Sequence, residues 1–109
     1  MRKFDLGSVI YTIGIGKLIK QVGIEEIRKC VARHSQCDWG DLCEEDKQLN
    51  DSAVVDGDRI LSCYHIGCDN TKIWIITEAD RSYTTILLPE EYWVLQNFFK
   101  KNTKKLLTL

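Results

Sequence analysis

Three apolar runs in the second half of this chain limit the folds that it can adopt, because only short polar connections separate them. The runs are Arg59–Ile66, Lys72–Thr77 and Ser82–Leu88, and β-branched and aromatic residues are common in them. Neither connection is long enough for a crossover helix, so the runs are predicted to form an antiparallel meander. The middle run is too apolar to have a wet face, and we expect it in the interior of the sheet.

Helical patterns dominate the first half, after one predicted strand at Phe4–Ile13. A short helix is expected at Lys17–Val22, and apolar residues at steps of three and four predict a second over Ile24–His34. A third is predicted over Leu42–Val55, and Pro89 suits the first turn of a C-terminal helix. The pattern predicts an α+β fold: an N-terminal strand, two or three helices, the meander and a C-terminal helix, with helices packed on one sheet face.

The third helix has specific signals at its start and along one side. Asp41 followed by Glu44 resembles a capping box, and the acids of the first turn suit the helix dipole. Leu42, Leu49 and Ala53 are predicted to share one side of this helix.

The chain has 109 residues and one proline, so we expect a single domain over residues 1–109. Residues 93–109 are expected to form a helical extension with a basic tail, whose apolar face is supplied by Tyr92, Leu95, Phe98 and Phe99.

Charge is distributed unevenly along the chain. Residues 36–58 contain eight acidic side chains and one basic side chain, whereas residues 92–109 contain four lysines and no acid. The formal net charge is only −1, which argues against attraction of the whole molecule to nucleic acid or membrane. The acidic segment is either a solvated helix face or a partner-facing surface, because charge complementarity selects partners.

Five cysteines cannot form a closed disulfide framework, and no secretory signal is recognised, so we expect reduced thiols in the cytoplasm. No apolar run approaches the ~20 residues that a membrane span needs. Two groups of side chains invite comparison with zinc sites, namely Cys30, His34, Cys37 and Cys43, and then Cys63, His65 and Cys68. Neither spacing matches a standard zinc module, and no metal or other cofactor is expected.

A GxGK sequence at Gly14–Lys17 resembles part of a phosphate-binding loop. A P-loop needs a glycine further upstream and a hydroxyl after the lysine, where this chain has Leu18. We therefore interpret the glycines as a turn between a strand and a helix.

Carboxylates are the remaining candidates for catalysis, because the chain has only two histidines and neither forms an evident catalytic pair. Acids from two loops could meet at one end of the sheet: Asp38, Asp41, Glu44, Glu78 and Asp80. Together they could hold Mg²⁺ for phosphodiester hydrolysis. Alternatively, Asp38 or Asp41 caps a helix and Asp80 forms a turn, which is the interpretation that we favour.

Trp39 lies outside every predicted apolar stripe and has acids nearby on both sides. It is either a core anchor, which we favour, or a recognition aromatic. Arg81 is either part of a site or a salt-bridge partner of Asp38 or Asp41. We also expect the loops around Trp39 and Asp80 to form one shared surface, on which charge serves partner binding more than folding.

Two stretches of the sequence resemble a family of short proteins carried by bacterial plasmids, phages and conjugative elements. The first is Arg33-His34 with Asp38–Lys47 and Asn50; the second is Arg59–Ser62 with Tyr64, Trp74–Ser82 and Thr84–Pro89. The resemblance covers residues 4–92. Members are usually called plasmid-related proteins, and some are labelled type I restriction endonuclease subunit M. This chain is too short to hold a methyltransferase domain, and the family has no established activity to carry over.

The first hypothesis is therefore a small non-enzymatic interaction protein of a mobile element, which binds a host or element protein through its acidic surface. The partner-binding candidates are Asp38, Trp39, Asp41, Asp46, Asn50, Glu78, Asp80 and Arg81. The alternatives are a metal-dependent phosphodiesterase that uses the clustered carboxylates, and weak nucleic-acid binding through the lysine tail. We expect a protein partner and neither a membrane nor a nucleic acid.

Overall fold

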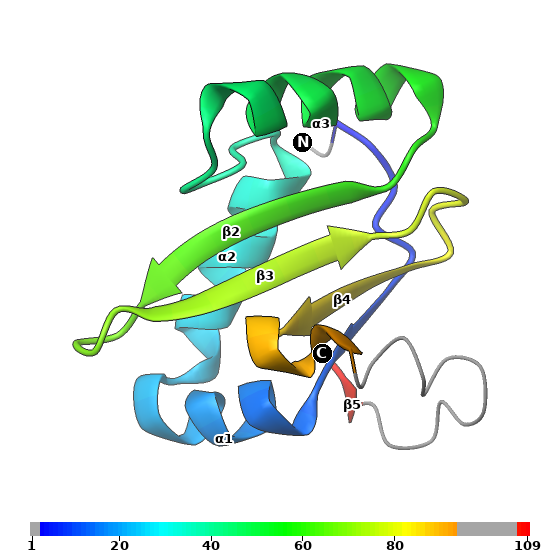
Figure 1. The fold of residues 1–109 in the computed structure, drawn as a ribbon. Coiled ribbons are helices and arrows are strands. Elements are labelled where there is room, and N and C mark those ends of the chain that lie inside the picture. Colours follow the sequence, from blue (N-terminus) through cyan, green and yellow to red (C-terminus); the bar gives the residue numbers. More distant parts are fainter. Residues whose placement is uncertain (1–2, 94–106) are drawn as a thin grey trace.

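The protein is built on one mixed β-sheet, which a computed structural model describes together with the helices for residues 3–93 and 107–109 (Figure 1). The elements are β1 (Ser8–Tyr11), α1 (Ile13–Val22), α2 (Ile24–Ser35), α3 (Glu44–Asp56), β2 (Ile60–Ile66), β3 (Thr71–Thr77), β4 (Tyr83–Leu87), the 3₁₀ turn η1 (Pro89–Glu91) and β5 (Leu107–Thr108). The strand order is β2-β3-β4-β1-β5. The predicted α+β class is confirmed.

The second half forms the antiparallel meander that its sequence predicts. Ile60 of β2 pairs with Thr77 of β3, and Trp74 of β3 pairs with Leu87 of β4. β3 has a neighbour on each side, as its apolar sequence predicts. Its Ile75 is fully buried on the helix side of the sheet, whereas Trp74 is half-buried on the other side.

The N-terminal strand adds a parallel pair that the sequence patterns do not predict. β1 runs alongside β4 in parallel, with Ser8 opposite Tyr83. Gly7 allows the chain to approach the start of β4: it has a φ of 65°, and a Cβ built there would lie 2.2 Å from the carbonyl oxygen of Ser82. Only glycine adopts this conformation at that distance without strain.

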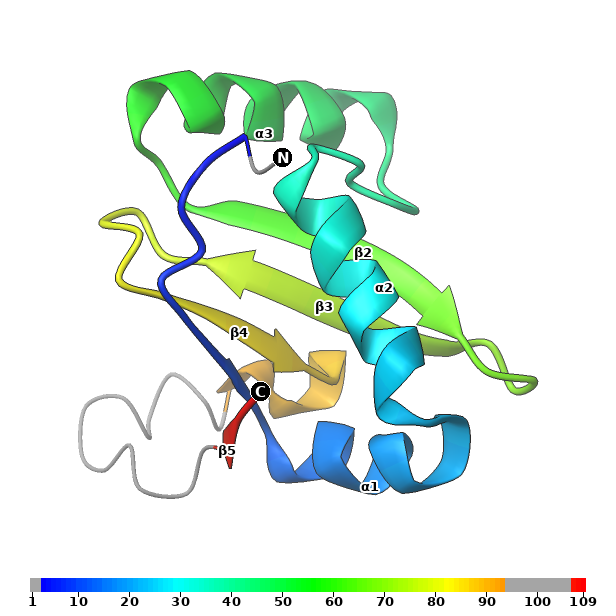
Figure 2. The same cartoon turned by 180° about the vertical axis from the view of Figure 1, so that it is seen from behind.

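The helices take two different positions around the sheet. α1 and α2 cover one face through Ile15, Leu18 and Ile27, which pack with residues of β2, β3 and β4, and Figure 2 shows α2 crossing this face. α3 lies instead beside β2, over a separate cluster centred on Trp39, Ala53 and Ile60. The expectation that helices pack on one sheet face therefore holds for α1 and α2 only. No helix among the described residues combines the length and apolar composition that a bilayer crossing requires.

α1 begins earlier than its sequence suggests, and β1 is correspondingly shorter than the predicted strand. Thr12 is the N-cap, and Gly14 and Gly16 lie within the first turns of the helix. The carboxylate of Glu91 accepts hydrogen bonds from the Gly14 amide at 3.0 Å and from the Thr12 hydroxyl at 2.5 Å. A Cβ on residue 14 would lie 2.7 Å from Glu91 Oε1, so this glycine makes room for the carboxylate instead of forming a turn.

The C-terminal part departs from the predicted helical extension at residues 107–108, whereas Tyr92 and Trp93 are helical as expected. Pro89 begins a 3₁₀ turn of three residues, and Leu107–Thr108 form β5, which pairs antiparallel with β1. Tyr92 packs its ring against Trp74 with the centroids 5.8 Å apart. The predicted helical face at Leu95, Phe98 and Phe99, and the lysine tail, lie outside the described residues.

Candidate interaction surface

α3 presents an acidic face, which we define as Glu44, Glu45, Asp46, Asp51 and Asp56. All five side chains are exposed, and none forms an ion pair within the described part of the chain. The single basic residue of the helix is Lys47. Among the described residues, the face therefore carries negative charge that no cationic side chain pairs with.

The start of α3 is capped differently from the prediction. The N-cap is Cys43, which makes no side-chain capping bond, so the capping box at Asp41 is wrong. The Asp41 carboxylate instead contacts Nδ1 of His65 at 2.7 Å, and its backbone amide donates to the carbonyl of Cys63. These two contacts with β2 draw Asp41 away from the helix end.

Beside α3 lies a cavity of about 310 Å³, which we name the α3–β2 groove; it is lined by Leu42, Asp46, Leu49, Asn50, Arg59 and Leu61. Leu49 is 68% exposed, whereas Ala53, which is predicted to share its side of the helix, is buried. Asp46 and Asn50 are predicted site residues that the structure brings together. Arg59 and Leu49 are functional candidates that sequence reasoning missed.

Asn50 is buried and holds the backbone of β2 through its side chain. Its Nδ2 donates to the carbonyl of Leu61 at 2.7 Å, and its Oδ1 accepts from the Leu61 amide at 3.2 Å. Cys63, the next residue of β2 whose backbone groups point outward, bonds to the segment before α3. Its amide donates to the Trp39 carbonyl, and its carbonyl accepts from the Asp41 amide. The outer edge of β2 is therefore closed at these two residues.

Trp39 is a core anchor, the alternative that its sequence context favours. It is 3% exposed, and its ring contacts those of Phe4 and His34 with centroids 6.1 and 5.8 Å apart. Its Nε1 donates to the carboxylate of Asp51 at 2.9 Å. Trp39 therefore packs against the inner side of α3, and its buried indole ring is not available for recognition.

Asp38 belongs to a local structural network. Its carboxylate accepts from Arg33 at 2.6 Å and from the Gly40 amide at 3.3 Å. The Arg33 hydrogen bond, with help from the Gly40 amide, lowers the pKa of Asp38. Arg33 is therefore the cation that pairs with Asp38.

The loop after β3 is tied to the C-terminal end of α3 by Arg81. The Arg81 guanidinium donates to the carbonyls of Ala53, Asp58 and Glu78 at 2.7 to 3.0 Å, and its backbone has a φ of 61°. The predicted salt bridge from Arg81 to Asp38 or Asp41 is wrong, because the Arg81 guanidinium donates its hydrogen bonds to these carbonyls instead. Arg81 positions the loop against the helix.

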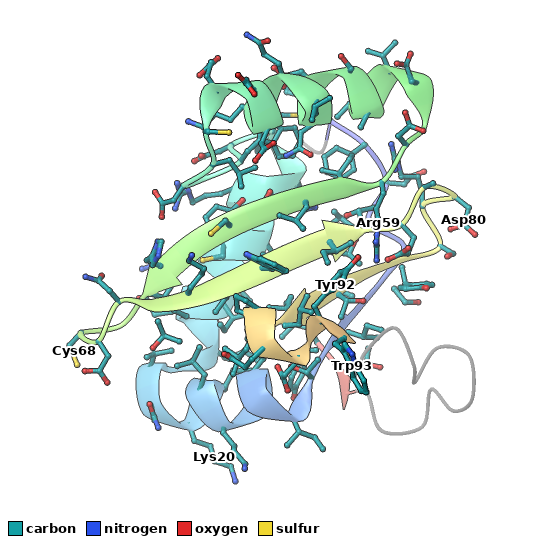
Figure 3. The ribbon with its side chains drawn as sticks, in the orientation of Figure 1. Lys20, Arg59, Cys68, Asp80, Tyr92 and Trp93 are labelled. Carbon is teal, nitrogen blue, oxygen red and sulfur yellow. The ribbon has the colours of Figure 1, made fainter. Side chains whose placement is uncertain are left out.

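The acids of this loop have local partners as well. Asp80 accepts from the amide and the hydroxyl of Ser82, which lowers the pKa of its carboxyl. Glu78 lies 3.4 Å from Arg59, and Arg59 also donates to the hydroxyl of Tyr92. Figure 3 shows Asp80 and Arg59 at the same end of the sheet, with Tyr92 nearby.

The two acidic loops do not converge. Asp41 contacts His65 near one end of β2, whereas the loop at Glu78–Ser82 follows Thr77, which pairs with Ile60 at the other end. At about 3.3 Å per residue, the two positions on β2 are roughly 16 Å apart. The expected shared surface of the Trp39 and Asp80 loops is therefore wrong, and the acidic face of α3 lies between them.

The proposed metal ligands are also dispersed or occupied. Both ring nitrogens of His34 are in hydrogen bonds, to Ser62 at 2.5 Å and to Thr77 at 2.8 Å. Burial raises the pKa of the Cys30 thiol to about 11, which disfavours the thiolate that a metal would need. Among the described residues, no three His, Cys, Asp or Glu side chains gather closely enough to hold a metal ion. The N-terminus of α1, where a phosphate would have to sit, holds the carboxylate of Glu91.

Comparisons with protein-family models, curated proteins and solved structures return no match to this chain. Function is therefore inferred from the surface itself.

Proposed function

We propose that the protein acts without catalysis and binds a partner protein through the acidic face of α3 and the adjoining Glu78–Ser82 loop. The observation that carries this proposal is the absence of ion-pair partners for that face within the described residues. Like charges that lie close together repel one another and lower stability, whereas a merely solvated face gains from mixed signs. A basic partner would offset this repulsion and would be steered to the face.

One exposed aliphatic side chain supports the same proposal. Leu49 is 68% exposed and lies on α3 among the carboxylates. Aliphatic side chains within a charged surface give a partner apolar area to bury, while the charges select which partner binds.

The cellular setting remains a proposal drawn from the sequence. The resemblance to plasmid and phage proteins favours a mobile-element protein whose partner belongs to the bacterial host or to the element. All five cysteines are unpaired, which favours the reducing cytoplasm.

The two alternative functions have less support than protein binding among the described residues. A carboxylate-dependent hydrolase requires its acids to converge, and the register of β2 separates Asp41 from Glu78 and Asp80. Nucleic-acid binding through the lysine tail concerns residues outside the described part of the chain, and the acidic α3 would repel a phosphate backbone.

Affinity capture from a bacterial lysate tests the proposal with charge-matched variants. The test variant carries Glu44→Gln, Glu45→Gln and Asp56→Asn on α3, and the control carries Glu25→Gln, Glu26→Gln and Glu90→Gln elsewhere. We expect the wild-type protein and the control to retain a protein that the test variant loses, while circular dichroism shows all three folded. Equal retention by all three, or equal loss from both variants, would contradict the proposal.

A further inference from the structure

The α3–β2 groove joins apolar walls to unbalanced negative charge. Leu42, Leu49 and Leu61 supply the walls, and Leu61 also packs against the apolar cluster on the sheet face that α1 and α2 leave uncovered. Asp46 lines the groove without an ion pair among the described residues, whereas Arg59 is bound to the Tyr92 hydroxyl and lies near Glu78. The groove therefore favours an apolar side chain that is accompanied by a cation.

The backbone of β2 offers no pairing site beside this groove. Asn50 occupies the amide and the carbonyl of Leu61, and the Trp39–Asp41 segment occupies those of Cys63. A partner in strand conformation would have to displace these bonds to add to the sheet. A helix satisfies its own backbone groups and needs only side-chain contacts with the groove.

We propose that the α3–β2 groove binds an amphipathic helix of the partner protein, and this inference rests on the proposed function. The apolar stripe of that helix presents a leucine-sized side chain to Leu42, Leu49 and Leu61. Lysine or arginine residues on its flanks face Asp46 and the rest of the acidic face. The groove thus supplies apolar contact, and the charge of α3 selects a basic helix over an acidic one.

A synthetic amphipathic peptide of leucine and lysine, about 14 residues long, is the direct probe. Its controls are a peptide of the same composition with the helical spacing scrambled, and a peptide with glutamate in place of lysine. The dissociation constant is measured by isothermal titration for the wild-type protein and for Leu49→Ser, Asp46→Asn and Val55→Ser. Val55 is the matched control, because it is exposed on the same helix but does not line the groove.

We expect Leu49→Ser to weaken binding of the leucine–lysine peptide about tenfold, as truncation of a groove contact does, and Val55→Ser to change it less than about twofold. Asp46→Asn should weaken binding and reduce its dependence on salt. The scrambled and glutamate peptides should bind weakly to every protein.

Equal losses from Leu49→Ser and Val55→Ser would contradict binding of the peptide in the groove. Equally tight binding of the scrambled peptide would contradict it too. Either result would mean that the peptide is held only by attraction between opposite charges. That result would not contradict the proposed function, which is tested separately by the charge variants in the lysate capture. Conversely, if the α3 charge variant captures every partner as well as the wild type does, the proposed function fails even when the peptide binds.

Discussion

Lowering the pH from 7 to 4 should destabilise this protein through one buried side chain, His34. The ring is fully buried between α2 and the sheet, with Nδ1 against the Ser62 hydroxyl and Nε2 against the Thr77 hydroxyl. Thr84 donates to the carbonyl of Leu6, so it accepts from Thr77, and Thr77 accepts from His34. Nε2 of His34 therefore carries a proton, and because burial lowers the pKa of the ring, Nδ1 carries none and accepts from Ser62.

The magnitude follows from the protonation of the folded and unfolded states. Burial, with a smaller contribution from the Arg81 guanidinium, lowers the pKa of His34 from 6.5 to about 3. Below pH 6.5, His34 binds a proton in the unfolded chain but not in the folded protein. The free energy of unfolding therefore decreases as the pH falls. The stability that His34 contributes is complete above pH 6.5, and about 3 kcal/mol of it is lost between pH 7 and pH 4.

Urea denaturation at a series of pH values measures this loss, with His34→Gln as the control. The amide of glutamine can donate and accept hydrogen bonds but does not titrate, and the variant keeps His65 and all the carboxylates. Its absolute stability is expected to be lower, so the comparison is between slopes. If wild type and variant lose stability equally between pH 7 and pH 4, His34 is not buried and neutral as described.

Three substitutions test other parts of the structure by urea denaturation. Asn50→Ala should cost about 2 kcal/mol, because it leaves two backbone groups of β2 without partners, whereas Gln48→Ala on the exposed side should change stability little. Gly14→Ala should destabilise the protein although alanine favours helices, because the added Cβ collides with the carboxylate of Glu91. Asp56→Asn should raise stability by about 0.5 kcal/mol, because it removes a negative charge from the C-terminal end of α3.

Much of this fold follows from local sequence patterns. α2 spans Ile24–Ser35 against a predicted Ile24–His34, because apolar residues at steps of three and four mark its buried side. The strands of the meander agree within a few residues, because β-branched runs and a tight turn at Gly67–Asn70 determine them. Where periodicity and turn chemistry agree, the local sequence is sufficient.

The remaining features depend on contacts between distant segments. The parallel pair of β1 and β4 joins residues about 75 apart, and no local pattern reports it. Gly14 resembles a turn residue until Glu91, from the other end of the chain, reaches the same helix end.

The candidate surface shows the same limit. Arg81 matches a salt-bridge residue in the sequence, yet the fold turns it onto backbone carbonyls. Leu49 has the helical spacing of a core residue, but α3 packs on Trp39 and Ile60 through Ala53, which leaves Leu49 exposed. The exposure of Leu49 can be inferred only once it is known which side of α3 packs on the rest of the protein.

Site-specific photocrosslinking in bacterial cells tests the central claim, that the outer side of α3 is the interaction surface. A photoreactive amino acid is placed at Gln48 or Ser52 on α3, and at Arg28 on α2 as the control; all three positions are exposed. The account predicts one discrete crosslinked species from both α3 positions and none from position 28. The same species from position 28, or no crosslinked species from α3, would contradict it.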